Sequence, residues 1–97
     1  MDKIKQRMKI GLERYGHGLR IHDDTRQWGT KENSWNEMAE EEILDALIYV
    51  AAHRLRENTT VDGINSTDDN EKIKKVLINS DDTIIQKLWE IHRLLSG

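Results

Sequence analysis

Three carboxylates at helical spacing are the side chains of this sequence best suited to chemistry. Asp45 is the only charge within the apolar run from Ile43 to Ala52. A carboxylate among hydrocarbon is costly unless a cation, a hydrogen-bond donor or a metal compensates it. Glu41 and Glu42 precede Asp45 by four and three positions, so on a helix all three point to roughly the same side. A hard cation such as Mg²⁺ would relieve their mutual repulsion.

A structural role for Asp45 is the alternative to a metal site. A buried cation such as Arg20 or Arg26 could pair with it, because structural ion pairs also hold carboxylates in apolar surroundings. Glu40 also precedes the apolar run, and it fits best as a solvated helix charge.

Charge is distributed unevenly along the first half of the chain. Residues 1–31 hold eight Lys or Arg against four acids, whereas residues 32–45 hold six acids and no base. The first stretch suits phosphates and the second suits cations. Arg20, Arg26 and Lys31 are candidate phosphate contacts, since the planar fork of Arg can engage two oxygens. The alternative is a solvated basic surface that complements the acidic one.

Histidines and tryptophans in the same region are candidate ligand contacts. His17 and His22 could bind phosphate or metal, although His in a glycine-containing loop more often makes local hydrogen bonds. Trp28 and Trp35 could stack on a base, with anchoring of a core or an interface as the alternative. Two further histidines fit packing or surface positions: His53 and His92.

The elements that position these residues are predicted to be helices. A first helix is expected over residues 3–15, with Asp2 as its cap and Gly16 as its stop. Residues 16–33 show no sustained period, and a loop of this length in a small domain is usually functional or disordered. Its apolar anchors favour an ordered binding loop: Leu19, Ile21 and Trp28.

A long central helix is predicted over residues 35–57. Ser34 and Glu37 form a capping box, in which the hydroxyl caps an early amide while the carboxylate reaches back to the amide of Ser34. The middle of the helix is apolar nearly all round, so other helices or a partner chain should enclose it. A polar connector follows, with a weak extended pair around Val61 and Ile64.

Two shorter helices are expected to complete the chain. Ser66 or Thr67 should cap one of them and Ser80 the other. Their apolar stripes are Ile73, Val76 and Leu77 in the first and Ile84, Leu88, Ile91 and Leu95 in the second. The expected fold is all-α: a single domain over residues 1–97, forming a small bundle of about four helices. Because so short a chain buries a modest core, oligomerisation should complete the bundle.

Composition narrows the classes of partner. The chain has no cysteine, no apolar signal segment, and an apolar run only about half the roughly 20 residues of a membrane-spanning helix. A cytoplasmic protein without a membrane partner is expected. A net charge of −3 without a sustained basic helix face argues against nucleic-acid binding.

Residues Glu41–Tyr49 resemble the second metal-binding motif of the MazG-like all-α nucleoside triphosphate pyrophosphohydrolases, Glu-x-x-Asp followed by an apolar helix. Three earlier segments are similar to small phage-encoded proteins grouped loosely with that family: Tyr15–Gly18, Asp23–Arg26 and Trp28–Thr30. The resemblance covers about the first 57 residues. It implies that helical carboxylates hold Mg²⁺ and that water attacks between the α- and β-phosphates, releasing a nucleoside monophosphate and pyrophosphate.

By this resemblance, Glu41, Glu42 and Asp45 are the expected catalytic metal ligands. Glu37 adds a further carboxylate at helical spacing from Glu41. The family also places a Glu-Glu-x-x-Glu motif on an earlier helix, and residues 1–30 contain none. A site for several metal ions would therefore need loop carboxylates or a partner chain. The loop candidates are Asp23 and Asp24.

Two functions are consistent with these residues. The first is a Mg²⁺-dependent pyrophosphohydrolase that acts on a nucleoside triphosphate, which the acidic triad favours. The alternative is a non-catalytic, phage-type protein that binds and sequesters a nucleotide or a nucleotide-derived immune signal, which the missing acidic motif favours. Both predict a small nucleotide-like ligand, and the modest core separately predicts a homo-oligomer.

Overall fold

The computed structural model describes residues 1–58 and 68–97 of the chain. Within these ranges it has no strand, and its elements are α1 (Asp2–Tyr15), the 3₁₀ helix η1 (Thr25–Trp28), α2 (Trp35–Asn58), α3 (Asn70–Asn79) and α4 (Thr83–Ser96). The predicted all-α fold with one long central helix is confirmed. The extended pair and the caps predicted between residues 61 and 67 lie outside the described residues. None of the described helices combines the length and the apolar character needed to span a bilayer.

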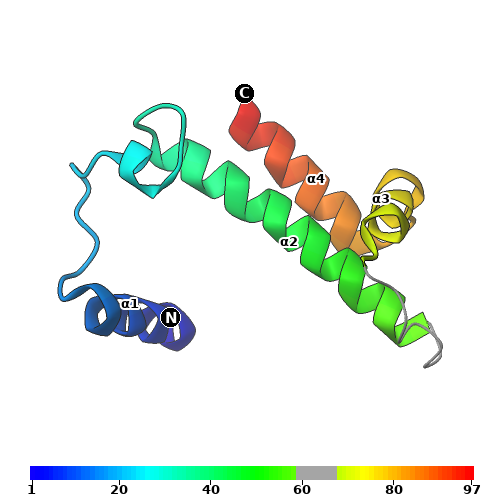
Figure 1. Ribbon diagram of the computed structural model, residues 1–97, viewed down its shortest axis with the longest axis horizontal. Coiled ribbons are helices and arrows are strands. Elements are labelled where there is room, and N and C mark those ends of the chain that lie inside the picture. Colours follow the sequence, from blue (N-terminus) through cyan, green and yellow to red (C-terminus); the bar gives the residue numbers. More distant parts are fainter. Residues whose placement is uncertain (59–67) are drawn as a thin grey trace.

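The core lies where α2 meets α3 and α4 (Figure 1). Among the described residues, its fully buried hydrophobic side chains are Leu47, Ala51 and Ile85. Partly buried residues pack around them: Val50, Ile73, Val76, Leu77 and Leu88. The predicted stripe of α3 is confirmed. In α4 the prediction is wrong for Ile84 and Ile91, which are exposed, because the covered side of that helix runs through Ile85 and Leu88.

One side of α2 is left uncovered in the single chain. Helices α3 and α4 both pack on the side of α2 that carries Leu47 and Ala51. No described element covers the other side of α2. Apolar residues therefore remain exposed along α2: Leu44, Ile48 and Tyr49. Asp45 is exposed between them. The chain's own helices therefore cover one side of α2, whereas the sequence predicted that the helix is enclosed all round.

The first helix ends as predicted but begins differently. Gly16 adopts a left-handed conformation with φ 78°, and its N–H donates to the carbonyl of Leu12 at 2.9 Å. This geometry favours glycine and explains why the helix stops there. Asp2 is the first helical residue and not the cap, which is Met1 without a side-chain hydrogen bond.

The last helix is capped two residues later than predicted. Asp82 Oδ1 accepts hydrogen bonds from the amides of Ile84 and Ile85 at 2.9 and 3.2 Å. The predicted cap, Ser80, instead accepts a hydrogen bond from the amide of Asp82 at 2.9 Å. Arg54 on α2 donates from Nε to Asp82 Oδ2 and so ties this helix start to the central helix.

Candidate functional site

Helix α1 stands apart from the other helices and is joined to them by the segment from Gly16 to Ser34 (Figure 1). It has no buried residue. The predicted loop over residues 16–33 contains the 3₁₀ helix η1, which the sequence pattern did not indicate. The position of α1 is therefore set by how this segment folds.

Thr25 organises the second half of the segment. Its fully buried Oγ1 accepts a hydrogen bond from the amide of Ser34 at 2.7 Å and lies 2.7 Å from the hydroxyl of Thr30. The amide of Thr25 donates to Asn33 Oδ1 at 3.0 Å. These polar bonds close residues 25–34 into a compact, ordered turn. The prediction that Leu19 and Ile21 anchor the loop is wrong, because both side chains are exposed.

The predicted capping box forms only in part. The amide of Glu37 donates to Ser34 Oγ at 3.2 Å, as expected. The Glu37 carboxylate does not reach back to Ser34, whose amide is bound to Thr25. It accepts instead from the amides of Lys31 and Glu32 at 2.9 and 3.0 Å, and these amides lower the pKa of Glu37. Glu37, which was predicted as a metal ligand, therefore connects the turn of residues 25–34 to the start of α2.

Two arginines of this segment pair with neighbouring aspartates. Arg26 Nε donates to both carboxylate oxygens of Asp24 at 2.9 and 3.0 Å. This side-chain bond, followed by the amide of Arg26, lowers the pKa of Asp24, and the carboxylate raises the pKa of Arg26. Arg20 Nε donates to Asp23 Oδ2 at 3.2 Å. The alternative in which Asp45 pairs with Arg20 or Arg26 is therefore wrong in this chain.

A hollow of about 810 Å³ lies between α1, the glycine-containing segment and the start of α2. The apolar side of α1 forms one wall of the hollow, and Trp28 and Trp35 contribute to the other. Its volume falls within the range of about 300–1,000 Å³ typical of small-molecule sites. The polar and aromatic residues of its lining include Arg7, Tyr15, His17, Arg20, Trp28 and Trp35.

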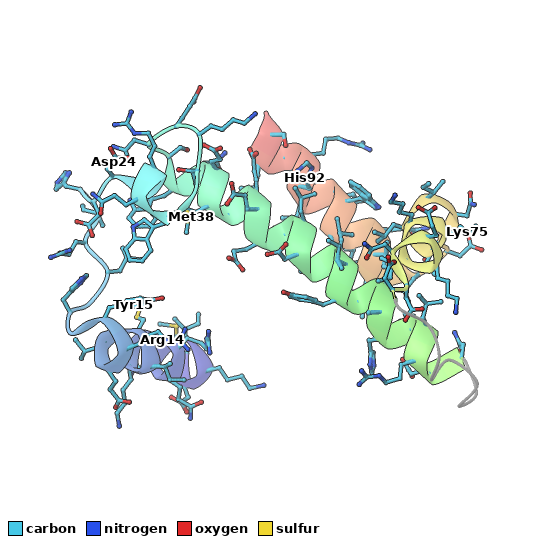
Figure 2. The ribbon with its side chains drawn as sticks, in the orientation of Figure 1. Arg14, Tyr15, Asp24, Met38, Lys75 and His92 are labelled. Carbon is cyan, nitrogen blue, oxygen red and sulfur yellow. The ribbon has the colours of Figure 1, made fainter. Side chains whose placement is uncertain are left out.

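Aromatic contacts fix one end of this hollow. Tyr15 lies on the side of α1 that faces η1 (Figure 2), and its ring meets Trp28 edge to face, with centroids 5.5 Å apart and planes at 84°. Trp35 Nε1 donates to the carbonyl of Ile21 at 2.9 Å, which fixes the indole against the loop. His17 Nδ1 lies 2.7 Å from the carbonyl oxygen of Gly18, the local hydrogen bond that was the alternative for this residue.

Four of the seven predicted ligand contacts line the hollow together: His17, Arg20, Trp28 and Trp35. His22, Arg26 and Lys31 are exposed and are not part of the lining. Lys3, Arg7 and Tyr15 also line the hollow and were not among the predicted contacts. Lys3 and Arg7 directly precede Ile4 and Met8 of the apolar stripe in α1, so the sequence indicates that both cations flank this stripe.

The acidic triad lies elsewhere, on the uncovered side of α2. Glu41, Glu42 and Asp45 are exposed and do not line the hollow. Their carboxylate oxygens suit Mg²⁺, which proteins hold through one or two carboxylates together with waters and substrate phosphates. Within residues 1–58 and 68–97, however, no three His, Asp or Glu side chains form a group that could hold a metal ion. The donor chemistry fits the ion, but a complete ligand set is not assembled in this part of the chain.

Comparisons with protein-family models, with curated proteins and with solved structures gave no match. The features of the chain that bear on function are the hollow beside α1 and the acidic residues of α2.

Proposed function

We propose that this chain binds a nucleotide or a nucleotide-derived small molecule at the end of the hollow formed by Tyr15, Trp28 and Trp35. The observation that carries the proposal is the composition of this end, where aromatic and basic side chains from α1, the loop and α2 line one hollow. A nucleotide combines a flat base with an anionic phosphate, so it matches both kinds of side chain.

The aromatic side chains supply the contact for a base. Trp28 is only partly covered, and its edge-to-face contact with Tyr15 leaves ring surface free. Trp35 is held by its bond to the carbonyl of Ile21 and so loses little further freedom on binding. Stacking of a base on an aromatic ring contributes about 1–3 kcal/mol and tolerates different bases.

Arg20 supplies the contact for phosphate at this end of the hollow. Arg20 uses only Nε for Asp23, so its terminal amino groups remain available to phosphate oxygens. Lys3 and Arg7 also line the hollow, but they lie about 18 and 12 Å from Tyr15 along α1 and so away from the aromatic end.

A second candidate is the Mg²⁺-dependent hydrolysis of a nucleoside triphosphate to the monophosphate and pyrophosphate. The observation that favours it is the exposed set Glu41, Glu42 and Asp45, none of which has a cationic partner among the described residues. Bound Mg²⁺ would neutralise phosphate charge and activate a water there. The carboxylates themselves would hold the ion and orient its waters.

Equilibrium dialysis with each common nucleoside triphosphate and Mg²⁺, followed by product separation, tests both candidates. Binding with unchanged ligand recovered after denaturation supports the binder and contradicts the hydrolase. Release of monophosphate that disappears in Asp45→Asn supports the hydrolase, with Asp81→Asn as the matched control on an exposed aspartate outside α2. Absence of binding to every nucleotide at millimolar concentration contradicts both.

A further inference from the structure

We infer that a second copy of this chain docks its uncovered α2 side on the apolar side of α1, and that the contact is reciprocal. Two surfaces are involved. The α1 surface consists of Ile4, Met8 and Leu12 with Lys3 and Arg7 beside them. The α2 surface consists of Ile48 and Tyr49 with Glu41 and Asp45 between them.

The α1 surface lacks a partner within the chain. Met8 is 68% exposed, and no residue of α1 is buried. A helix of 14 residues is marginal in water without tertiary packing. Gly11 lies within this surface, and nothing stands within 4 Å of the position where its Cβ would be. A second helix can therefore approach α1 closely at this point.

The α2 surface is uncovered for a different reason. Asp45 and Tyr49 stand two positions before and after Leu47, so they point away from the side that α3 and α4 cover, and Ile48 lies at the edge of that side. Tyr49 is 69% exposed and Ile48 is 42% exposed. The surface thus places two carboxylates between two exposed apolar side chains.

Charge identifies the occupant as a second copy. Helix α1 carries five Lys or Arg and two acids. The segment from Glu37 to Asp45 carries five acids and no base. The two surfaces therefore attract each other, whereas two α1 surfaces or two α2 surfaces repel. Because one chain holds both members of the complementary pair, two copies satisfy both surfaces at once.

The arrangement closes as a two-fold dimer, in which each copy donates one α1 surface and one α2 surface. It also accounts for the few fully buried hydrophobic side chains found in the described ranges, since a chain of this size often needs a partner to complete its core. Asp45 and Glu41 of the second copy would lie near Lys3 and Arg7. If the proposed function holds, the acids of one copy then lie along the same hollow whose aromatic end, in the other copy, binds the nucleotide.

Charge reversal on each surface separately tests the contact. The first variant is Lys3→Glu/Arg7→Glu, and the second is Glu41→Lys/Asp45→Lys. Sedimentation of the wild-type chain should give twice 11.4 kDa. Each variant alone should be monomeric, because both of its contacts are then between like charges. An equimolar mixture should dimerise again, because one contact is charge-reversed on both sides and the other is unchanged.

The control is Lys75→Glu/Lys87→Glu, the same change of charge on exposed residues of α3 and α4, and it should remain dimeric. A monomeric wild type, variants that still dimerise, or a mixture that stays monomeric while both variants keep their helical circular dichroism would overturn the inference. Should a double variant lose its helices, Arg7→Glu and Asp45→Lys alone give the same readout. Nucleotide binding is measured separately, so a dimer that binds no nucleotide leaves the contact standing and contradicts only the proposed function.

Discussion

Asp45 illustrates how a residue's neighbours in sequence differ from its neighbours in space. Ala46 and Leu47 follow it directly, yet successive residues of a helix point about 100° apart, so Leu47 enters the core while Asp45 does not. The cost inferred from an apolar run is therefore absent in the single chain. In the proposed dimer, Asp45 would lie among apolar and cationic side chains. To hold a metal ion, it would need further ligands from outside the described residues.

Thr25 is the residue on which the shape of the hollow most depends. Thr25→Val keeps the side-chain shape but leaves the amide of Ser34 and the hydroxyl of Thr30 without this partner. The loss of such a partner costs about 1–3 kcal/mol. The amides of Lys31 and Glu32 report opening of the turn, and their hydrogen exchange should accelerate by about 5- to 150-fold.

The matched control for this measurement is Thr83→Val, at an exposed threonine of α4. Exchange of the same two amides should be unchanged in the control. Equal exchange rates in Thr25→Val and the wild type would show that the threonine does not hold the turn.

At the scale of elements, the boundaries of the helices follow closely from local chemistry. Gly16 predicts the end of α1 because only a left-handed residue suits that position, and the central helix begins where Ser34 predicts. The start of α4 is less determined locally, since Ser80, Asp81 and Asp82 can all cap a helix. Arg54 decides between them by binding Asp82, and this long-range contact has no local signature.

The pairing of Arg54 with Asp82 predicts a pH dependence of stability. The Arg54 side chain, followed by the amides of Ile85 and Ile84, holds the pKa of Asp82 below its usual value of 3.8. A carboxyl whose pKa is lowered on folding stabilises the folded state above its unfolded pKa, and this contribution is lost as the pH falls through the folded pKa. Asp82→Asn retains an oxygen that caps the helix but removes the charge.

Thermal unfolding of wild type and Asp82→Asn should therefore differ most at about pH 7 and converge at about pH 2. Arg54 and Asp82 are partly exposed, so the difference is expected to be modest and reduced by salt. Asp81→Asn is the control, because the carboxylate of Asp81 makes no bond within the described ranges. A difference between Asp82→Asn and wild type that does not change with pH would contradict the assigned role of the ion pair.

At the scale of the whole molecule, the described part of the chain depends on a small core. Leu47 is fully buried where α2 meets its two neighbours, so Leu47→Ala should lower the free energy of unfolding by about 2–5 kcal/mol. Leu94→Ala is the matched control, because Leu94 is 80% exposed on α4. Its effect should stay within about 0.5 kcal/mol. Urea unfolding followed by circular dichroism compares the two, and equal effects would contradict the location of the core.

The placement of α1 could not be predicted from the sequence. Its apolar stripe, with Ile4, Met8 and Leu12, indicates a helix that packs against something, but periodicity does not identify the partner. The same limit applies to α2. Apolar residues surround most of this helix, so its sequence does not indicate which side the other helices of the chain cover. Trp28 and Trp35 could be named as candidates from their residue type. For Lys3 and Arg7 the sequence indicates only that they flank the apolar stripe, and that they line the hollow follows from the folded position of α1.

A pair of tryptophan substitutions tests whether the aromatic end of the hollow binds a nucleotide. Trp28 and Trp89 have nearly equal exposure, 41% and 40%, but only Trp28 lines the hollow. Isothermal titration of the tightest-binding nucleotide should show that Trp28→Ala weakens affinity by about 5- to 150-fold, which corresponds to the stacking of one base. Trp89→Ala should leave the affinity unchanged. Equal affinities of Trp28→Ala and wild type, or equal losses in both variants, would contradict the account.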